Sequence, residues 1–532
     1  MTTFYAVSTI GLAFFTVSWF LFKDAVWAGK APRLLFWSTL ALYWLSILGI
    51  QTTNGSINTI GLMAKDALVL AAIGILSFVL RHHKFPLLLL LFGIAAGSYF
   101  YYFQELRQNA GYTMPKENQL PDAVAEEESL PELAPEGELL IQVARAEDLE
   151  VVRRILMPWK VRIEPAFSQI SAADMTTLDE YYRVDIPAEF AGAYEQIYEL
   201  LVNSGRTNDV VYNEIMALSP ADMQMVVAAS APAASAQYPV NDPLADSMSH
   251  WPLLQFKAFL PLFAEKKPVR KAKIAILDTG IDGSHEDLKD VFVSSGPQHD
   301  RDVIGHGTHC AGIAAAVTNN GIGIGSFAGN TDWVQITSIK VLNDLGAGTQ
   351  QTILAGIVAA ADQGADVISM SLGGPRNALS QRLYDEAIQY ANRKNAIVVT
   401  AAGNDNRKAL RFLPAASPHA ITVSAVDEQG NKAGFSNFFE NSTAELGVAA
   451  PGTRILSTLP GNRYGRMNGT SMAAPCVSGL VAILKALQPD ITTRQAYELL
   501  WQSGIETPNA IQTGRVIQPE RLLMQQNATA QQ

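Results

Sequence analysis

The chain has 532 residues, and at roughly 150 residues per domain this length predicts about three or four structural units rather than one core. Apolar residues make up 48% of the composition and charged residues 17%, which excludes wholesale disorder and favours a membrane-embedded part. The net charge of −11 offers no basic surface to phosphate backbones, so we expect no nucleic-acid partner. Two cysteines are too few for a disulfide scaffold or a four-cysteine zinc site.

The apolar excess lies in residues 1–103, in four runs that each have about the length needed to cross a membrane. We expect four transmembrane helices, with three as the alternative because Lys65 and Asp66 shorten the third run. Buried helices of a soluble domain are the competing interpretation, and a cleaved signal peptide fits poorly because no basic residue precedes the first run. The runs are Phe4–Phe22, Leu34–Ile50, Ile60–Leu80 and Pro86–Phe103.

Basic residues in the short loops predict the orientation of these helices. The loops at residues 23–33 and 81–84 contain lysine and arginine, whereas the loop at residues 51–59 contains neither. The loops at residues 23–33 and 81–84 should therefore face the cytoplasm. With four helices, everything after Phe103 then lies outside the cytoplasm. We therefore expect contact with membrane lipid, and a bacterial periplasm or cell surface as the location of the remaining chain.

Residues 104–138 form an acidic, Pro-rich stretch with too little apolar surface to fold, which predicts a spacer. Residues 139–220 show the strand and helix periodicities of a βαββαβ unit, which fits a ferredoxin-like sandwich. This topology alone indicates no function. The expected strands are Leu139–Ala144, Val161–Phe167, Tyr182–Ile186 and Val210–Met216, and the expected helices lie around residues 149–156 and 190–201.

Residues 221–240 are rich in Ala, Ser and Pro and lack periodicity, so they should form a second linker. A passive tether and a processing site are its two interpretations. From 241 to 523 the pattern is α/β, with short apolar strands between helical segments, which predicts a largely parallel sheet flanked by helices. Residues 524–532 should be a disordered tail. The expected strands of the sheet are Lys273–Leu277, Val334–Val341, Val367–Met370, Ala396–Thr400 and Ala420–Ala425.

Three fragments at strand ends and helix starts supply an acid, an imidazole and a hydroxyl: Asp278, His306 and Ser471. A serine hydroxyl is a weak nucleophile near neutral pH, so it needs a base within hydrogen-bond reach and a third group to orient that base. His306 and Asp278 can supply both. Attack creates an oxyanion, for which Asn404, just after an apolar strand, and the N–H of a serine that opens a helix are suitable donors.

With these fragments in this order, the region 241–523 resembles the subtilisin-like serine proteases, most closely their thermitase-like branch. The resemblance implies that Asp278 orients His306, that His306 acts as general base and then acid, that Ser471 is the nucleophile and that Asn404 helps to hold the oxyanion. His309 resembles a second histidine of the family that is not catalytic. The resemblance covers a little over half of the chain.

The resemblance also implies how a substrate is held. Two segments match the strands that border the family's cleft, and a peptide would lie between them as an added β-strand. We expect the floor of the primary pocket near residues 411–414; the sequence does not identify which substrate side chain the pocket prefers. The residues of the two segments are Gly346, Ala347 and Gly348 on one side and Ser371, Leu372 and Gly373 on the other.

A structural calcium ion is a further implication of the resemblance. The matching positions offer two carboxylates, one amide oxygen and backbone carbonyls, a donor set that suits Ca²⁺ better than Zn²⁺. The alternative for the loop at residues 317–324 is an ordinary Asn/Gly turn. The matching residues are Asp242, Asp287, Val317, Asn320, Ile322 and Ile324.

Cys310 and Cys476 lie in helical, small-residue surroundings, so buried free thiols are expected, although spacing does not decide whether they pair. Secreted relatives often carry a propeptide of βαββαβ topology, so residues 139–220 could inhibit the enzyme intramolecularly or serve as an adaptor domain. The sequence as a whole predicts a membrane-tethered serine endopeptidase that acts on proteins or peptides outside the cytoplasm. The alternative is a membrane sensor or scaffold whose protease fold mainly binds a partner.

Overall fold

A computed structural model describes residues 132–135, 137–167, 170–218, 226–227, 237–443 and 445–529. The four N-terminal apolar runs and most of the acidic spacer lie outside the described residues. Within the described residues, one helix is long and apolar enough to cross a membrane, α11 (Thr470–Leu487), and 94% of its apolar window is buried inside the protein. This helix belongs to the core of the larger sheet.

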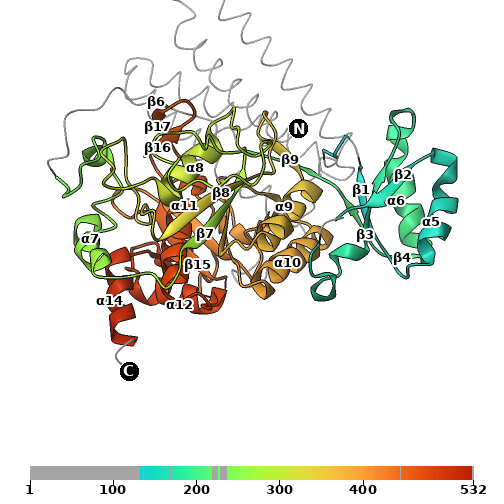
Figure 1. Ribbon diagram of the computed structural model, residues 1–532. Helices are drawn as coiled ribbons and strands as arrows, with labels where there is room; N and C mark the ends of the chain where they lie inside the picture. The colour runs from blue at the N-terminus through green and yellow to red at the C-terminus, as the bar shows by residue number, and fades with distance from the viewer. Residues whose placement is uncertain are drawn as a thin grey trace, which may run out of the picture. The chain divides into compact units, whose positions relative to one another are not determined.

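Residues 139–212 form a four-stranded antiparallel sheet with two helices (Figure 1). The strand order is β2-β3-β1-β4, and with the helices the chain order is βαββαβ. The strands are β1 (Leu139–Val143), β2 (Arg162–Pro165), β3 (Tyr181–Asp185) and β4 (Thr207–Tyr212); the helices are α5 (Asp148–Leu156) and α6 (Tyr194–Asn203).

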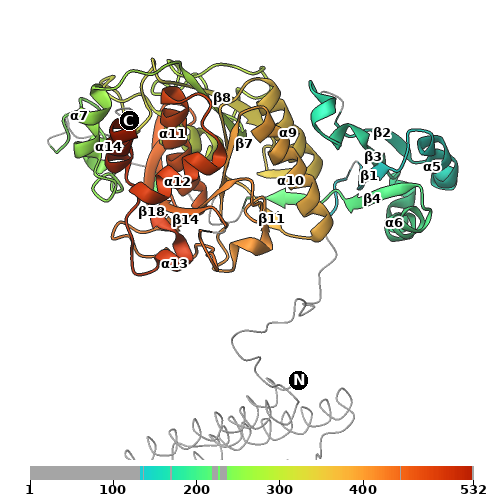
Figure 2. The same cartoon turned by 90° about the horizontal axis from the view of Figure 1, so that it is seen from below.

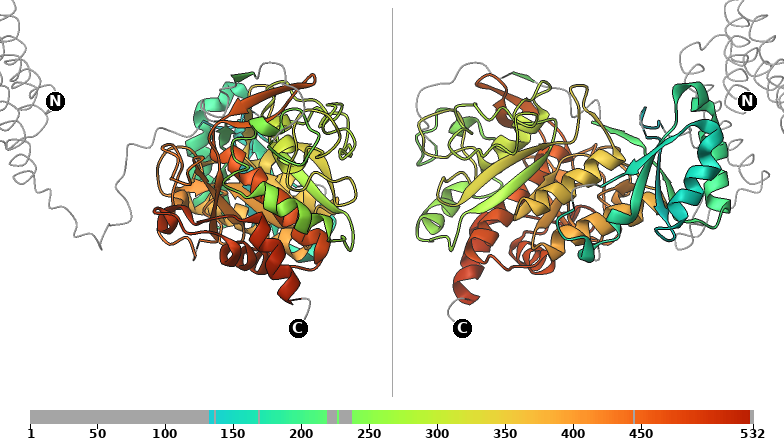
Figure 3. Two further views of the ribbon diagram at one scale, coloured as in Figure 1. Left: turned by 90° about the vertical axis from the view of Figure 1, so that its left-hand side faces the viewer. Right: turned by 45° about the vertical axis from the view of Figure 1, so that its right-hand side comes forward.

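The two faces of this small sheet have different partners, as the alternation of side chains along a strand requires. Leu139 and Ile141 of β1 pack against the apolar faces of α5 and α6. Leu140, between them, belongs instead to an apolar cluster that includes α9 (Gln350–Asp362) and α10 (Ala378–Arg393) of the larger unit. Figure 3 shows α5 and α6 on the side of the sheet that faces away from α9 and α10. The small unit is therefore docked through a buried sheet face.

The last predicted strand, Val210–Met216, is wrong as one strand. β4 ends at Tyr212, and a separate strand β5 (Ile215–Ala217) pairs antiparallel with β9 (Ala347–Thr349) of the larger unit. Asn213 lies at the change of partner: its Nδ2 donates to the Gly137 carbonyl at 2.7 Å, and its Oδ1 accepts from the Gln351 N–H at 3.0 Å. The side-chain amide bridges the two units, a role that apolar periodicity does not reveal.

The larger unit contains a seven-stranded sheet of order β18-β15-β14-β12-β10-β7-β8 in which all neighbouring strands are parallel. The sequence predicted five of these strands. It missed β15 and β18, because one is rich in Gly, Ala and Pro and the other has two residues. The strands are β7 (Ala272–Asp278), β8 (Val334–Lys340), β10 (Val367–Met370), β12 (Ile397–Ala401), β14 (Ile421–Val426), β15 (Gly447–Pro451) and β18 (Arg515–Val516).

Both faces of this sheet are covered, which explains why its strands read as continuous apolar runs. Ile274 and Ile276 of β7 face a cluster that includes α8 (His306–Ala315) and α11, whereas Ala275 and Leu277 face the cluster of α9 and α10. Helices α9 and α10 lie side by side on their face (Figure 2). The other elements are α7 (Phe256–Ala264), α12 (Thr493–Ser503), α13 (Ala510–Thr513), α14 (Pro519–Thr529), β6 (Val226–Val227), β11 (Gly374–Pro375), β13 (Phe412–Leu413), β16 (Ile455–Leu459) and β17 (Arg463–Met467).

The predicted start of a disordered tail at residue 524 is wrong. Helix α14 continues to Thr529, and the Gln526 side chain, which is 5% exposed, accepts a hydrogen bond from Gln488 at 2.5 Å. The polar composition of this segment hid a helix that packs on α7 and α12.

The order of the strands predicts where a site should lie. Strand β7 is the first strand of this sheet in chain order. The next two strands of the sheet along the chain, β8 and β10, pair with β7 on opposite sides. Connections that leave to opposite sides of a strand open a crevice at its carboxyl end. Asp278 is the last residue of β7, and Ser371 directly follows β10.

Candidate active site

The structure brings Asp278 and His306 together in the interior. His306 is the first residue of α8, and its Nδ1 lies 2.8 and 2.9 Å from the two carboxylate oxygens of Asp278. Both side chains are fully buried. Gly307 makes this approach possible, because a Cβ there would lie 2.1 Å from the Gly280 carbonyl oxygen and 3.1 Å from the Asp278 Cβ. The contact fixes Nδ1 as the protonated nitrogen of the neutral ring.

The charge of Asp278 decides the basicity of the imidazole. Burial alone would lower the pKa of His306, but the attraction of the adjacent carboxylate outweighs it and holds the pKa well above the usual value. His306 therefore accepts a proton readily at its other nitrogen. That nitrogen, Nε2, is buried and has no hydrogen-bond partner among the described residues.

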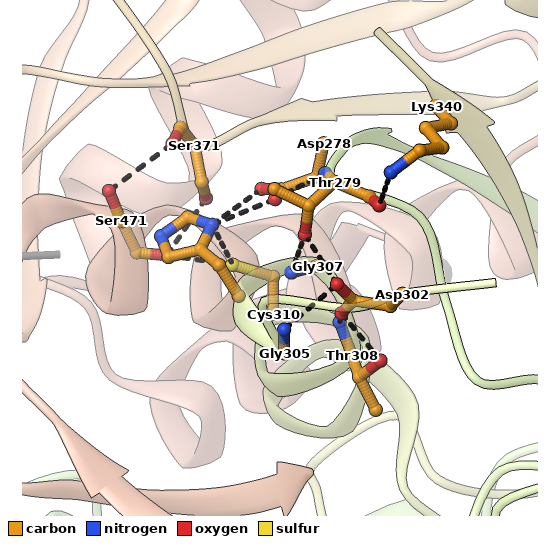
Figure 4. A network of polar contacts seen from close by, with 11 residues as sticks. Asp278, Thr279, Asp302, Gly305, Gly307, Thr308, Cys310, Lys340, Ser371 and Ser471 are labelled. Atoms are coloured by element: carbon orange, nitrogen blue, oxygen red, sulfur yellow. Dashed lines mark hydrogen bonds and ion pairs between the residues drawn. The ribbon is translucent and has the colours of Figure 1, made fainter. Parts of the chain in front are cut away.

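Ser471 lies in the first turn of α11, but its hydroxyl does not contact His306 in this structure. Its Oγ donates to the Ser371 carbonyl oxygen at 3.3 Å, as Figure 4 shows. The Ser371 hydroxyl in turn donates to the Ser471 carbonyl at 2.8 Å. The expected hydrogen bond from the Ser471 hydroxyl to His306 is thus replaced by one to the carbonyl of Ser371, the residue after β10. A change of the Ser471 rotamer is needed before His306 can take its proton, and loose contacts of this kind are common before substrate binds.

Asn404 is oriented by the residue that precedes Ser471. The Thr470 N–H donates to the Asn404 Oδ1 at 2.9 Å, and the Thr470 hydroxyl donates to the same oxygen at 3.0 Å. Since a backbone N–H can only donate, the oxygen of the amide must face Thr470, which directs Nδ2 elsewhere. Asn404 and Ser471 line one cavity of about 230 Å³.

Sequence reasoning missed a second buried carboxylate, that of Asp302, which is 6% exposed. Its Oδ1 accepts from the Thr279 hydroxyl at 2.9 Å and the Gly305 N–H at 2.8 Å, and its Oδ2 accepts from the N–H and hydroxyl of Thr308 at 2.9 and 2.7 Å (Figure 4). The Thr279 hydroxyl also accepts from the Gly307 N–H at 3.0 Å. These bonds join the residue after Asp278 to both neighbours of His306. The available signal was an acidic residue four positions before His306.

One predicted substrate-binding segment, residues 371–373, lines this cavity, and the other, residues 346–348, is paired with a strand of the chain itself. Ser371, Leu372 and Gly373 line the cavity beside Ser471, together with Ala217 and Leu218. β5 pairs with β9, with Met216 opposite Gly348 and Ala217 opposite Ala347, and the Leu218 N–H donates to the Gly346 carbonyl at 2.9 Å. No ladder between β5 and residues 371–373 is present within the described part. Phe412 and Leu413, from the expected pocket floor, also line the cavity.

The predicted calcium residues include two fully buried carboxylates, Asp242 and Asp287. Burial raises the pKa of Asp242 to about 6 and the pKa of Asp287 to about 7, the latter with a contribution from the charge of Asp242. Neither is ion-paired with a basic side chain in the part of the chain that the structure describes. Two buried carboxylates without a basic partner fit a bound cation.

The remaining members of that set are arranged less simply than predicted. Asn320 directs Nδ2 to Asp287 Oδ1 at 2.8 Å, while its Oδ1 accepts from the Ile322 N–H at 2.8 Å. The Ile324 N–H donates to Asp287 Oδ2 at 2.8 Å. Val317 joins the cluster through its N–H, which donates to the Asp287 carbonyl at 3.1 Å. N–H groups of Asn320 and Ile324 thus contact the Asp287 carboxylate, and the backbone N–H groups of Asn319 and Asn320 contact the Asp242 carboxylate, where oxygen ligands of a cation were expected.

The two thiols are free and buried, as predicted. Cys310 Sγ lies 4.0 Å from His306 Nδ1. Burial raises the pKa of the Cys310 thiol, and it raises the pKa of the Cys476 thiol to about 12. His309 has no place in the catalytic contacts: its Nε2 lies 3.0 Å from the Gly465 carbonyl, and burial lowers its pKa to about 3. Its neutral ring supports a structural role.

Comparisons with known proteins find relatives of this sequence. A family model described as the subtilase family matches residues 270–518. The chain is 41% identical to thermitase of Thermoactinomyces vulgaris over 252 residues, which cover 46% of this chain and 85% of that protein. It is 39% identical to subtilisin DY of Bacillus licheniformis over 250 residues, which cover 46% of this chain and 87% of that protein. A solved structure of a protease from Pseudoalteromonas arctica is 27% identical, with a TM-score of 0.46, and covers 54% of this chain and 99% of that one.

The Asp302 network generates a prediction. In Asp302→Asn an NH₂ group replaces one oxygen, so whichever way the amide turns, either the Gly305 or the Thr308 N–H loses its acceptor. His306 would be held less firmly, and kcat for peptide hydrolysis should fall about tenfold or more with a much smaller change in KM. Loss of the nearby negative charge should also move the acid limb of the kcat/KM profile to lower pH.

Asp300→Asn is the matched control, because Asp300 lies on the same loop and accepts a hydrogen bond from the Ser294 hydroxyl at 2.6 Å, away from His306. It should leave the profile unchanged. If Asp302→Asn lowers thermal stability but leaves kcat and the acid limb as in the wild type, Asp302 supports the loop without positioning His306.

Proposed function

Since this chain belongs to the subtilase family and is a serine endopeptidase, we propose that Asp278, His306 and Ser471 carry out the hydrolysis. The observation that carries the proposal is the contact of His306 Nδ1 with both oxygens of the buried Asp278 carboxylate, which leaves Nε2 without a partner on the side of the ring that a nucleophile must reach.

The proposed reaction begins when the Ser471 hydroxyl turns from the Ser371 carbonyl to His306 Nε2. His306 accepts the hydroxyl proton as Oγ attacks the scissile carbonyl, and the Asp278 charge stabilises the resulting imidazolium. His306 then returns the proton to the leaving amine, and water releases the acyl group by the same route. The oxyanion would be held by Asn404 Nδ2 and by the Ser471 N–H at the start of α11.

The substrates are proteins or peptides, and we propose that they bind as an added β-strand along β9 and residues 371–373. The pairing of β5 with β9 supports this mode, since it shows that the edge accepts an extended segment. Backbone pairing tolerates many sequences, so affinity should come largely from main-chain hydrogen bonds.

Residues 139–220 are proposed to inhibit the enzyme from within the chain. Beyond the pairing of β5 with β9, the Tyr181 hydroxyl and the Arg382 guanidinium both bond the Asp209 carboxylate, at 2.9 and 2.8 Å. The Ser171 N–H donates to Asp362 of α9 at 2.9 Å. A unit attached at the cleft and on two helices would exclude a substrate until it is cleaved or displaced. An adaptor role would not require β5 to occupy the cleft.

The location is proposed from the sequence alone. The apolar runs within residues 1–103 would anchor the chain in a membrane, and the basic loops would place the catalytic unit outside the cytoplasm. Cleavage of the linker would then separate the enzyme from its anchor.

We also propose a structural Ca²⁺ held by the Asp242 and Asp287 carboxylates, with Asn320 and the carbonyls of Val317, Ile322 and Ile324 completing the set. When bound, the ion would supply positive charge to two buried acids. Its stabilising effect should then come from removing their mutual repulsion and their desolvation penalty.

Ser471→Ala should abolish peptide hydrolysis while leaving the fold intact, because it removes one buried oxygen and no core volume. Asn404→Ala should lower kcat by about 10²-fold or more with little change in KM, because the oxyanion exists mainly in the transition state. Steady-state kinetics with a fluorogenic peptide measure both. Unchanged hydrolysis by pure Ser471→Ala protein would refute the assignment of the nucleophile, and an effect of Asn404→Ala on KM alone would remove its oxyanion role.

Calcium should raise the melting temperature, because an ion that binds only the folded form stabilises it. Burial raises the pKa of both acids, so the calcium-free folded state should lose stability as the pH rises through about 6 to about 7. The increment should therefore be larger near about pH 8 than near about pH 5. Differential scanning fluorimetry with calcium or chelator tests this. Asp287→Asn should remove most of the increment and exposed Asp290→Asn none of it; a melting temperature insensitive to chelator in the wild type excludes the site.

Maturation can be tested on membranes from expressing cells. With Ala217 and Leu218 in the cleft beside Ser471, the wild type should release a soluble fragment that starts within residues 217–237, and Ser471→Ala should remain full length in the membrane fraction. N-terminal sequencing identifies the cut. A wild-type chain that stays full length and hydrolyses substrate would show that the linker is a permanent tether.

A further inference from the structure

The Met216 side chain of β5 fills an apolar socket in the larger unit. It is 3% exposed and belongs to the cluster that includes Ile353 of α9 and Leu383 of α10. Gly374 forms part of the wall: a Cβ there would lie 3.1 to 3.4 Å from three atoms of the Met216 side chain. The socket is thus already matched to a long, unbranched side chain.

One polar group stands in this socket, the hydroxyl of Tyr384 on α10. Tyr384 is fully buried, and its hydroxyl donates to the Met216 Sδ at 3.1 Å. Within the described residues, this hydroxyl makes no other hydrogen bond. Thioether sulfur is a weak acceptor, but a buried hydroxyl without any acceptor costs free energy. The socket therefore favours an occupant with an acceptor at that depth.

The position of Met216 corresponds to one residue of a bound substrate. Met216 lies opposite Gly348 in the β5–β9 pairing, and two residues later the Leu218 N–H bonds the Gly346 carbonyl. A side chain at Gly348 would collide with the Val341 carbonyl oxygen, 2.2 Å from its Cβ, so the strand keeps a glycine at this register. Any segment that pairs along β9 in this register directs the side chain opposite Gly348 to the Tyr384 socket.

We propose that Tyr384 is a specificity-determining residue that selects polypeptide segments with methionine opposite Gly348; this rests on the proposed binding of substrates along β9. Norleucine has the shape of methionine but offers no acceptor, so it leaves the hydroxyl unpaired. Leucine is shorter and branched, and it leaves part of the socket unfilled. Glutamine carries an acceptor, but its amide would also bring unpaired donors into apolar surroundings.

The test uses full chains that carry Leu218→Pro, which removes the hydrogen bond to Gly346 and frees the cleft from β5, with fluorescent casein as the reporter substrate. The wild type and the tyrosine variants below are compared in this background. Peptides that copy residues 212–221, with methionine, norleucine or leucine in place of Met216, compete with casein for the cleft, and their inhibition constants are compared. The wild type should bind the methionine peptide at least about threefold more tightly than the norleucine peptide. Tyr384→Phe should bind the two peptides equally, through loss of affinity for methionine.

Tyr390→Phe is the matched control, because Tyr390 lies on the same helix and its hydroxyl donates to Asp362 instead, at 2.5 Å. It should keep the discrimination. Equal constants for methionine and norleucine in the wild type, or discrimination that survives in Tyr384→Phe, would overturn the proposal. Casein hydrolysis reports the protease activity separately, so an active enzyme without discrimination refutes this inference alone. If Tyr384→Phe does not fold, the wild-type comparison of the two isosteric peptides decides.

Discussion

The contact between the Asp278 carboxylate and the His306 imidazole is the interaction around which the catalytic unit is arranged. A fully buried carboxylate is tolerated only when donors surround it, and removing one partner of a buried pair is costly. The end of β7 supplies the acid and the start of α8 supplies the ring, so strand and helix must meet closely. Gly307 permits that approach, and its N–H donates to the Thr279 hydroxyl. Asp302 accepts from that hydroxyl and from the Gly305 N–H on the other side of His306. The same contact makes the ring basic and orients its free nitrogen.

The sheet and the cleft follow from one topological feature. Strands β8 and β10 lie on opposite sides of β7, so a crevice opens at the carboxyl end of β7. Ser371 and Asn404 line this crevice together with Ser471 of α11. The β9 edge beside this crevice offers main-chain groups to any extended segment. In this chain the segment is β5, delivered by a small unit whose sheet buries one face on its own helices and the other on α9 and α10. Folding of the small unit and occupation of the cleft are thus coupled through a shared core.

Local motifs carried most of what the sequence could predict about the site. Asp278, His306, Ser471 and Asn404 lie in short fragments whose neighbours, small residues and strand ends, are readable without the fold. Asp302 was missed because an acidic residue in a polar loop has no pattern of its own, and its bond to Thr279, 23 residues earlier, exists only in the folded chain. The rotamer of Ser471 depends in the same way on the Ser371 carbonyl, which is 100 residues distant in sequence.

Strands could be predicted from the sequence where their burial requires a recognisable pattern of apolar residues. The two-sided burial of β7, β10, β12 and β14 produced apolar runs, whereas β15, with Gly447 and Pro451 at its ends, did not. The division between β4 and β5 escaped prediction because both strands continue one apolar pattern, interrupted by only two polar residues, Asn213 and Glu214, where the partner changes. The expected membrane helices lie outside the described residues and stay a prediction.

In the proposed mechanism, a competent serine nucleophile lies in a cleft that the chain's own strand occupies. The most direct measurement is the rate at which a fluorophosphonate labels Ser471 in the unprocessed full chain, compared with a Leu218→Pro chain that lacks the hydrogen bond to Gly346. Labelling at Ser471, located by mass spectrometry, should be slow in the first and clearly faster in the second. Equal rates would show that β5 does not obstruct the cleft, and absence of labelling in both folded chains would contradict the assignment of Ser471 as the activated nucleophile.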